Sequence, residues 1–157
     1  MNISKISQLA YQFRSATDDA FKQGEFDRNY PFDRFPNDCC DDMCDLFGQF
    51  LFERNISVFK VHGIYRYDNW EHKYPHVWLQ LEDKTVIDLT GDQYRNNSIM
   101  LNYSNPCFVG EANELHRLFE EDIRIYPFYG IDNYNDANTR RRLWELYEII
   151  LDFMIKD

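Results

Sequence analysis

The apolar residues of the chain recur at helical spacing in two long segments, one near each end. In residues 3–22 the apolar positions follow a period near 3.6, and Gly24 comes directly after the segment. Residues 136–155 carry a second amphipathic pattern, whose apolar face consists of Leu143, Trp144, Tyr147, Ile150, Leu151 and Met154. Both segments are therefore predicted to be helices with one face on a core. The run TRRRLW, residues 139–144, is interpreted as the solvated first turns of the second helix.

A third helix is predicted from about Cys40 to Arg54. Positions i, i+3, i+4, i+7 and i+8 of this segment form one apolar face, made of Met43, Leu46, Phe47, Phe50 and Leu51. Asp38 is placed to act as the N-cap, and carboxylates in the first turn suit the positive end of the helix dipole. Asn55 is a suitable left-handed stop after the helix.

Between these helices, apolar and polar residues alternate as they do in strands. Residues 57–67 predict one strand, and residues 76–90 predict two strands around a polar turn at 82–84. A short helix is expected over 111–121 and a further strand with its exit over 123–131. Helices, then an antiparallel sheet, then helices again predict an α+β fold, with a single domain spanning 1–157.

Composition and charge narrow the class of protein. Hydrophobic residues make up 44% of the 157 residues, which favours a folded core over a disordered chain. The net charge of −10 argues against binding to nucleic acid or to an anionic membrane surface. The start of the chain lacks a basic segment before a long apolar run, and no stretch reaches the ~18 apolar residues of a membrane span. We expect a reduced, cytoplasmic protein, although export without a cleavable signal fits the same features.

Three of the four cysteines stand close together in FPNDCCDDMCDLF, residues 35–47. Cys40 joins the inward stripe of the predicted helix and lies in its first turn. Free backbone N–H groups and the helix dipole favour a thiolate there, and the same N–H groups can hold an oxyanion. The neighbouring carboxylates Asp38, Asp41 and Asp42 oppose a thiolate. They must therefore point to solvent if Cys40 is to act as a nucleophile.

The predicted hairpin supplies a partner for this thiol. If its turn centres on Glu82, His76 lies directly opposite Asp88, on the same face of the sheet. A carboxylate in that position fixes the tautomer and orientation of the imidazole, as a nucleophile-activating base requires. Asp92 competes with Asp88 for this role, but it follows Gly91, beyond the predicted strand.

The order of these residues resembles the papain-like superfamily in its transglutaminase-like form. That pattern has a Cys opening a helix, a small residue four positions later, His-x-Trp on a strand, and Asp-x-Thr on the next strand. The matching residues are Cys40, Cys44, His76, Trp78, Asp88 and Thr90. The FP-x-x-CC helix start and the HxWL strand also resemble uncharacterised bacterial relatives. The resemblance covers residues 35–94, and Val77 and Cys44 depart from the residues usual at their positions.

The resemblance implies a nucleophile helix packed on an antiparallel sheet, with flanking N- and C-terminal helices. It implies a cysteine protease, glutamine deamidase or transglutaminase-like acyltransferase acting on the amide bonds of a protein or peptide. Cys40 is then the nucleophile, His76 the base and Asp88 the orienting acid, with no cofactor. Two pairs of residues are candidates for lesser roles: side-chain oxyanion donors are Asn37 and Gln93, and cleft-lining residues are Trp78 and Cys39.

Several alternatives stay open. The choice of Cys40 over Cys39 as the nucleophile rests on two observations. Cys40 has the helical phase of the inward stripe, and it lies four residues before Cys44, as the family pattern requires. A zinc site built from the cysteines with Cys107 or a His lacks paired C-x2-C spacing, and a vicinal disulfide is strained, so no metal is expected. A non-catalytic acidic binding or immunity-like protein on the same fold is the rival function. Three histidines show no convincing partners: His62, His72 and His116.

Overall fold

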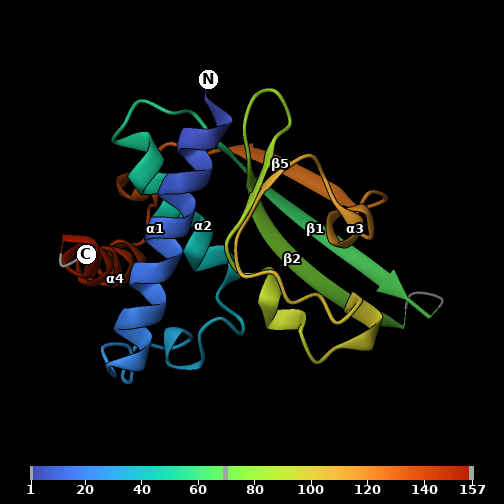
Figure 1. The fold of residues 1–157 in the computed structure, drawn as a ribbon, viewed down its shortest axis with the longest axis horizontal. Helices are drawn as coiled ribbons and strands as arrows, with labels where there is room; N and C mark the ends of the chain where they lie inside the picture. The colour runs from blue at the N-terminus through green and yellow to red at the C-terminus, as the bar shows by residue number, and fades with distance from the viewer. Residues whose placement is uncertain (1, 69–70, 156–157) are drawn as a thin grey trace.

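A computed structural model describes residues 2–68 and 71–155 of the chain (Figure 1). Within these residues it contains four α-helices and five strands, which confirms the predicted α+β class. The helices are α1 (Ile3–Lys22), α2 (Cys40–Phe52), α3 (Glu114–Arg117) and α4 (Ala137–Ile155). The strands are β1 (Phe59–Tyr67), β2 (His72–Gln80), β3 (Val86–Asp88), β4 (Phe108–Gly110) and β5 (Ile123–Pro127). Short 3-10 segments are η1 (Phe32–Arg34), η2 (Gly91–Tyr94), η3 (Ser98–Met100) and η4 (Ile131–Asn133).

The strands form one antiparallel sheet in the order β4-β3-β2-β1-β5. The long pair β1 and β2 is the centre of the sheet, with Gly63 opposite His76 and Val61 opposite Trp78. β3 continues the sheet from β2, and its register pairs Leu79 with Ile87. Because side chains alternate between faces along a strand, His76 and Trp78 point to one face and Val77 and Leu79 to the other.

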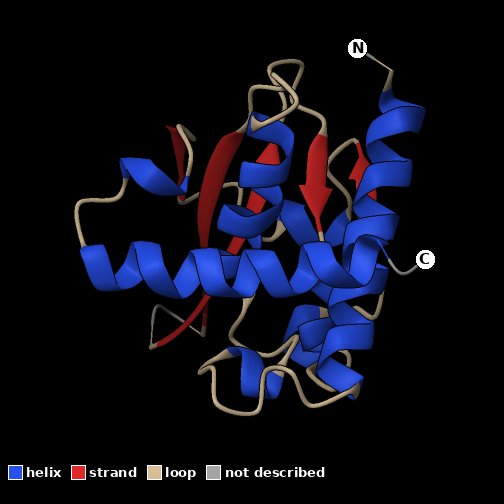
Figure 2. Cartoon of the chain, turned by 90° about the vertical axis from the view of Figure 1, so that its left-hand side faces the viewer, coloured by secondary structure: helices blue, strands red, loops and turns tan. Residues whose placement is uncertain are grey.

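Each face of the sheet carries its own core. On one face, α1, α2 and α4 pack against Val77, Leu79 and Ile87, and Figure 2 views this layer with a long helix crossing in front of the strands. The other face is covered by α3 and the segments around η2 and η3. Its core consists of Val61, Trp78, Val86, Tyr94, Met100, Tyr103, Leu115 and Phe119. The sheet is therefore covered on both sides at the end of β2 and along β3, so a side chain on either face there can be excluded from water, whereas the edge strand β5 is exposed.

The predicted helices match the structure closely where their apolar pattern is strong. Residues 3–22 are helical as expected, with the Asn2 side chain accepting the backbone N–H of Ser4 as the N-cap. Asn55 has the expected left-handed backbone, with φ of 57°. The segment 111–121 is helical only over the four residues of α3, because Asn113 caps a helix that stops at Arg117. Of the helices in the described part of the chain, none has the length and apolar character to cross a bilayer.

The start of α2 differs from the prediction at one position. Cys39, not Asp38, occupies the N-cap, and its side chain makes no capping hydrogen bond. Asp38 instead has a left-handed backbone, with φ of 60°, and its carboxylate forms an ion pair with Arg34 at 2.9 Å. The chain turns at Asp38 before the helix begins, and its carboxylate pairs with Arg34 instead of capping α2.

Candidate active site

His76 and Asp88 meet in the interior on the α3 face of the sheet. Nε2 of His76 lies 2.7 Å from Oδ2 of Asp88, and both side chains are almost wholly buried. The two residues are not directly opposite, as predicted, because the β2–β3 register extends to place position 78 opposite Asp88. The offset is two residues, which keeps both side chains on one face as diagonal neighbours. The predicted contact is present, and the predicted register was wrong.

Asp88 is surrounded by hydrogen-bond donors. Its Oδ2 contacts Nε2 of His76 and also Nε2 of His116 at 2.8 Å, while its Oδ1 accepts the backbone N–H of Thr90 at 3.1 Å. Burial alone would raise the pKa of Asp88, but the two imidazoles hold it well below its usual range. Asp88 is therefore an ionised carboxylate in a buried site.

This carboxylate determines the charge preference of His76. Burial alone would lower the pKa of His76, but attraction to Asp88, the hydrogen bond to Asp88 and the nearby Cys40 thiol raise it to about 10. The imidazolium form of His76 is thus favoured at neutral pH. A cation placed beside a thiol favours the thiolate, which is the reactive form of cysteine.

Cys40 is the first residue of α2, and its side chain is close enough to His76 to raise the pKa of the imidazole. Because Nε2 of His76 faces Asp88, Nδ1 is the ring nitrogen that remains for the thiol. Cys40 is also the one cysteine of the four that is not fully buried; all four are free thiols. The thiol therefore combines partial access, a basic partner and the N-terminal end of a helix.

The other three cysteines are packed in the interior. The Cys39 thiol donates to the backbone carbonyls of Pro31 and Asn37, at 3.4 and 3.2 Å, and burial raises its pKa far above the usual range. Burial likewise raises the pKa of Cys107 to about 12 and that of Cys44 well above its ordinary value. Helical phase in the sequence favoured Cys40 over Cys39 as the nucleophile. The surroundings of the two thiols favour Cys40 as well, because Cys39 is buried and Cys40 is partly accessible.

Each carboxylate close to Cys40 in the sequence is paired with a cation. Asp38 meets Arg34, Asp41 lies 2.5 Å from Nζ of Lys60, and Asp42 accepts two hydrogen bonds from Arg142 at 2.6 and 3.0 Å. A nucleophilic Cys40 was expected to require that these carboxylates point to solvent. Asp42 does not meet that requirement, because it is buried, and Arg142 of the TRRRLW run provides its countercharge instead. Neutralised carboxylates oppose a nearby thiolate less than free ones do.

Of the two candidate oxyanion donors, Gln93 lies at the site. Its Nε2 is 3.4 Å from Nδ1 of His76, and the same amide donates to the carbonyl of Thr90 at 3.1 Å. Asn37 has an exposed side chain in the loop before α2, and it shares with Gln93 the lining of a surface hollow of about 470 Å³. The structure thus brings the Gln93 amide to the imidazole and leaves Asn37 at the rim of the hollow.

Trp78 and Cys39, expected to line a cleft, are both interior residues. Trp78 is 2% exposed, and its ring centroid lies 5.7 Å from that of His76 and 4.9 Å from that of His116. Cys39 is 0% exposed. Alternation along β2 puts Trp78 on the His76 face, which the α3 layer covers, so Trp78 packs against the site instead of lining a cleft. Cys39 belongs to the core on the opposite face of the sheet.

Asp92, the rival to Asp88, has a different partner. Arg14 of α1 holds it with two hydrogen bonds, at 2.8 and 2.7 Å, and donates further to the carbonyls of Leu89 and Pro106. This buried arginine ties the chain after β3 to the helical layer. Asp92 therefore positions the segment that carries Thr90 and Gln93, and Asp88 is left as the acid that contacts His76.

His116 was missed by the sequence reasoning. Asn113 and His116 have the three-residue spacing of a capping box, which predicts a helix start and a local contact of the imidazole. That pattern does not indicate that the other ring nitrogen reaches Asp88, 28 positions earlier. The contact depends on how α3 packs on the sheet.

The geometry of these residues argues against a metal site. In the part of the chain that the structure describes, two groups of side chains have ligand atoms within 4.8 Å of one another, and neither contains a cysteine. The buried group is His76, Asp88 and His116. Its N···O distances of 2.7 and 2.8 Å are those of hydrogen bonds with a proton between each pair, and Nδ1 of His116 accepts a backbone N–H. The arrangement fits a proton network better than a zinc site.

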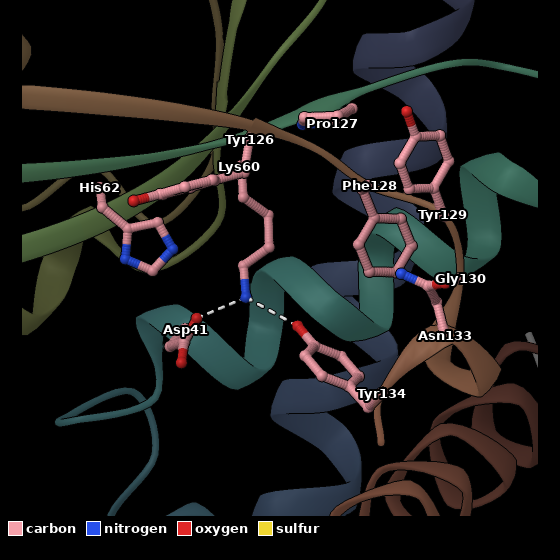
Figure 3. A pocket seen from close by; sticks show the side chains of 10 residues that line it. All are labelled: Asp41, Lys60, His62, Tyr126, Pro127, Phe128, Tyr129, Gly130, Asn133 and Tyr134. Atoms are coloured by element: carbon pink, nitrogen blue, oxygen red, sulfur yellow. Dashed lines mark hydrogen bonds and ion pairs between the residues drawn. The ribbon is translucent and has the colours of Figure 1, made fainter. Parts of the chain in front are cut away.

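A second hollow, of about 310 Å³, lies beside the start of α2 (Figure 3). The Lys60 side chain crosses it, and its ammonium donates to Asp41, Asp45 and Tyr134 at 2.5, 2.8 and 3.2 Å. These contacts use all three N–H donors of Lys60. Lys60 therefore serves to neutralise Asp41 and Asp45 within the protein.

Comparisons with models of protein families, with curated protein sequences and with solved structures find no match to this chain.

Proposed function

We propose that the protein is a cysteine-dependent enzyme that breaks or exchanges amide bonds. One observation carries the proposal. The His76 imidazole is held by the ionised Asp88 on one nitrogen and interacts with the partly accessible Cys40 thiol at the first residue of a helix. Nucleophile, base and orienting acid in this order are the parts that thiol catalysis of acyl transfer requires.

In the proposed reaction, the Cys40 sulfur attacks the carbonyl carbon of an amide and a C–S bond forms. Before the attack His76 holds the thiol proton at Nδ1, so that the sulfur attacks as a thiolate beside an imidazolium. The negative charge that develops on the carbonyl oxygen is held by backbone N–H groups of the first turn of α2. The C–N bond then breaks, and His76 returns the proton to the departing amine. This leaves a thioester on Cys40.

The second half restores the enzyme. Water or an acceptor amine attacks the thioester carbonyl, His76 accepts a proton from the attacking group, and the C–S bond breaks to release the Cys40 sulfur. Water completes peptide cleavage or glutamine deamidation, whereas an amine completes transamidation. We assign a protein or peptide as the substrate class, and no step of this reaction requires a cofactor.

The fold supports the same proposal. A helix that begins at the nucleophile and packs on an antiparallel sheet, with His and Asp on adjacent strands, is the arrangement that the papain-like, transglutaminase-like resemblance implied. We propose that the chain is a small member of that superfamily with flanking helices α1 and α4. A cytoplasmic enzyme with reduced cysteines agrees with its four free thiols.

The rival function is a non-catalytic acidic binding or immunity-like protein on the same fold. One observation favours it. The space that Cys40 shares with Met43, Phe47 and Thr90 is too small for a water molecule, so a substrate must reach the thiol from another side. The net charge of −10 also suits a protein that binds a basic partner.

Alkylation of the thiols by iodoacetamide, followed over pH, separates the two functions. For an enzyme, Cys40 reacts rapidly near pH 6, and His76→Ala slows the reaction at that pH. Cys40→Ser identifies the reacting thiol by abolishing the fast phase, and Cys39→Ser is the matched control that leaves it intact. A wild-type protein whose thiols react only at alkaline pH, with or without His76, contradicts the catalytic proposal. An electrophilic amide probe then tests acyl transfer directly.

A further inference from the structure

Asp88 has two imidazole partners, and the proposed triad uses only one of them. His116 donates to the same Oδ2 that contacts His76, at 2.8 against 2.7 Å, and all three side chains are buried. We propose, resting on the proposed function, that His116 is a positioning residue of the active site, which fixes the Asp88 carboxylate and shares its charge with His76.

The tautomer of His116 follows from its second contact. The backbone N–H of Asn113 donates to Nδ1 of His116 at 3.5 Å. A backbone N–H is only a donor, so Nδ1 must present its lone pair and the ring proton must sit on Nε2. His116 is thereby poised to donate to Asp88.

The three donors leave Asp88 little freedom. Oδ2 accepts from two imidazoles and Oδ1 accepts the backbone N–H of Thr90. Rotation of the carboxylate about its Cβ–Cγ bond would break all three hydrogen bonds in a buried site, where unpaired polar groups are costly. Without His116, Asp88 would keep two donors and could tilt toward or away from His76.

His116 is itself held from the α3 side. The Asn113 amide donates to the hydroxyl of Tyr103 at 2.8 Å, and the Asn113 side chain accepts backbone N–H groups of α3. Phe119, just after α3, packs 5.9 Å from the His76 ring in space left by Gly63. The α3 segment therefore braces the proposed site from the face opposite α2.

Sharing of Asp88 also has an electrostatic consequence. The titratable groups around the His76 ring are Asp88 from β3, Cys40 from α2, His116 from α3 and Tyr94 from η2. Burial raises the pKa of Tyr94, so its hydroxyl stays neutral while it donates to the carbonyl of Pro75. Without His116, the negative charge of Asp88 is no longer shared with a second donor and attracts the His76 proton more strongly. The His76 imidazolium would then persist to higher pH.

The test compares His116→Leu, which lacks a donor, with His116→Gln, whose amide can still donate near the position of Nε2. His72→Leu is the matched control, because His72 is exposed and its acidic partner is Asp68, not Asp88. The readout is the rate of Cys40 alkylation by iodoacetamide between pH 5 and 10, together with urea unfolding to verify folding.

In His116→Leu we expect the alkylation rate at pH 7 to fall about ten- to a hundredfold, since misplacement of a catalytic group has effects of that order. We also expect the limb of its profile assigned to His76 deprotonation to move to higher pH. His116→Gln should recover most of the rate and the wild-type profile.

A folded His116→Leu protein with the wild-type rate and profile would overturn the positioning role while leaving the proposed function in place. A wild-type thiol that is indifferent to His76 overturns both. If His116→Leu does not fold, the decision rests on His116→Gln and on ¹⁵N NMR of the imidazoles in the wild-type protein. A His116 proton on Nε2 with wild-type reactivity in His116→Gln supports the role; a proton on Nδ1 alone overturns it.

Discussion

His76 and Asp88 form their 2.7 Å contact as diagonal neighbours across a hairpin, with Trp78 and not His76 at the position opposite Asp88. The Cβ atoms of a diagonal pair are farther apart than those of a directly opposed pair, so the two side chains must point toward each other to meet. Their approach is supported from both sides, by the Gln93 amide at Nδ1 of His76 and by His116 and Thr90 on Asp88. The contact is one member of a network, and each member can be tested.

Replacing Asp88 with Asn should affect the thiol more than any other change in the network apart from loss of Cys40 or His76. An amide can turn its N–H toward Nε2 of His76 and thereby favour the wrong tautomer, as in serine proteases. We expect the iodoacetamide rate at pH 7 to fall by roughly 10³-fold or more. Glu82→Gln, in the exposed turn of the same hairpin, is the control and should not change it. Equal rates in the two variants would remove Asp88 from the proposed triad.

The His76–Asp88 pair should give the protein a distinctive loss of stability in mild alkali. Despite burial, Asp88 and Cys40 raise the pKa of His76 from 6.5 to about 10, so the folded state keeps a proton that the unfolded state has lost. The contribution is complete below pH 6.5 and disappears as pH rises through the folded value. We expect the free energy of unfolding to fall across this window with a limiting slope of about 1.4 kcal/mol per pH unit. Urea titrations of wild type and His76→Gln measure it, and parallel curves for the two proteins would contradict the assignment.

The ion pair between Asp42 and Arg142 should protect the reactivity of Cys40. Arg142→Gln leaves a mostly buried carboxylate without its cation two residues from the thiol. The unpaired negative charge of Asp42 disfavours the Cys40 thiolate, so alkylation at neutral pH should slow about two- to tenfold. The double variant Asp42→Asn with Arg142→Gln should return to the wild-type rate, because charge and countercharge are removed together. Arg141→Gln, on the exposed side of α4, is the control; a double variant as slow as the single one would point to packing instead of charge.

Gly63 should tolerate no side chain, because a Cβ there would lie 2.6 Å from Cβ of Phe119. Gly63→Ala must displace Phe119 and the α3 segment that carries His116. We expect a loss of stability of about 1–3 kcal/mol and slower alkylation of Cys40. Gly110→Ala in β4 is the matched glycine, since its nearest contact is the tip of the Phe108 ring at 3.2 Å. Urea unfolding of both variants checks the difference, and equal costs would contradict the steric argument.

Local patterns were sufficient for several features of the fold and the site. The 3.6 period predicted α1 over its full length and placed Cys40 at the start of α2. The period of two put His76 and Asp88 on a common face even though the assumed turn centre was displaced. Such patterns work because they arise from backbone geometry within a few residues. The N-cap was mispredicted because the left-handed turn at Asp38 is stabilised by Arg34 in the preceding segment.

The sequence by itself determined the α+β class, the helix start at Cys40 and a strand pair that could bring His76 to Asp88. Only the tertiary structure decided which groups surround them. Arg142 reaches Asp42 across 100 positions, Arg14 takes Asp92 across 78, and His116 joins Asp88 across 28. Periodicity has no information on these pairings, because a charged or polar residue has the same local pattern whichever partner it meets. Burial makes the pairing obligatory, and the packing of α1, α3 and α4 on the sheet selects the partner.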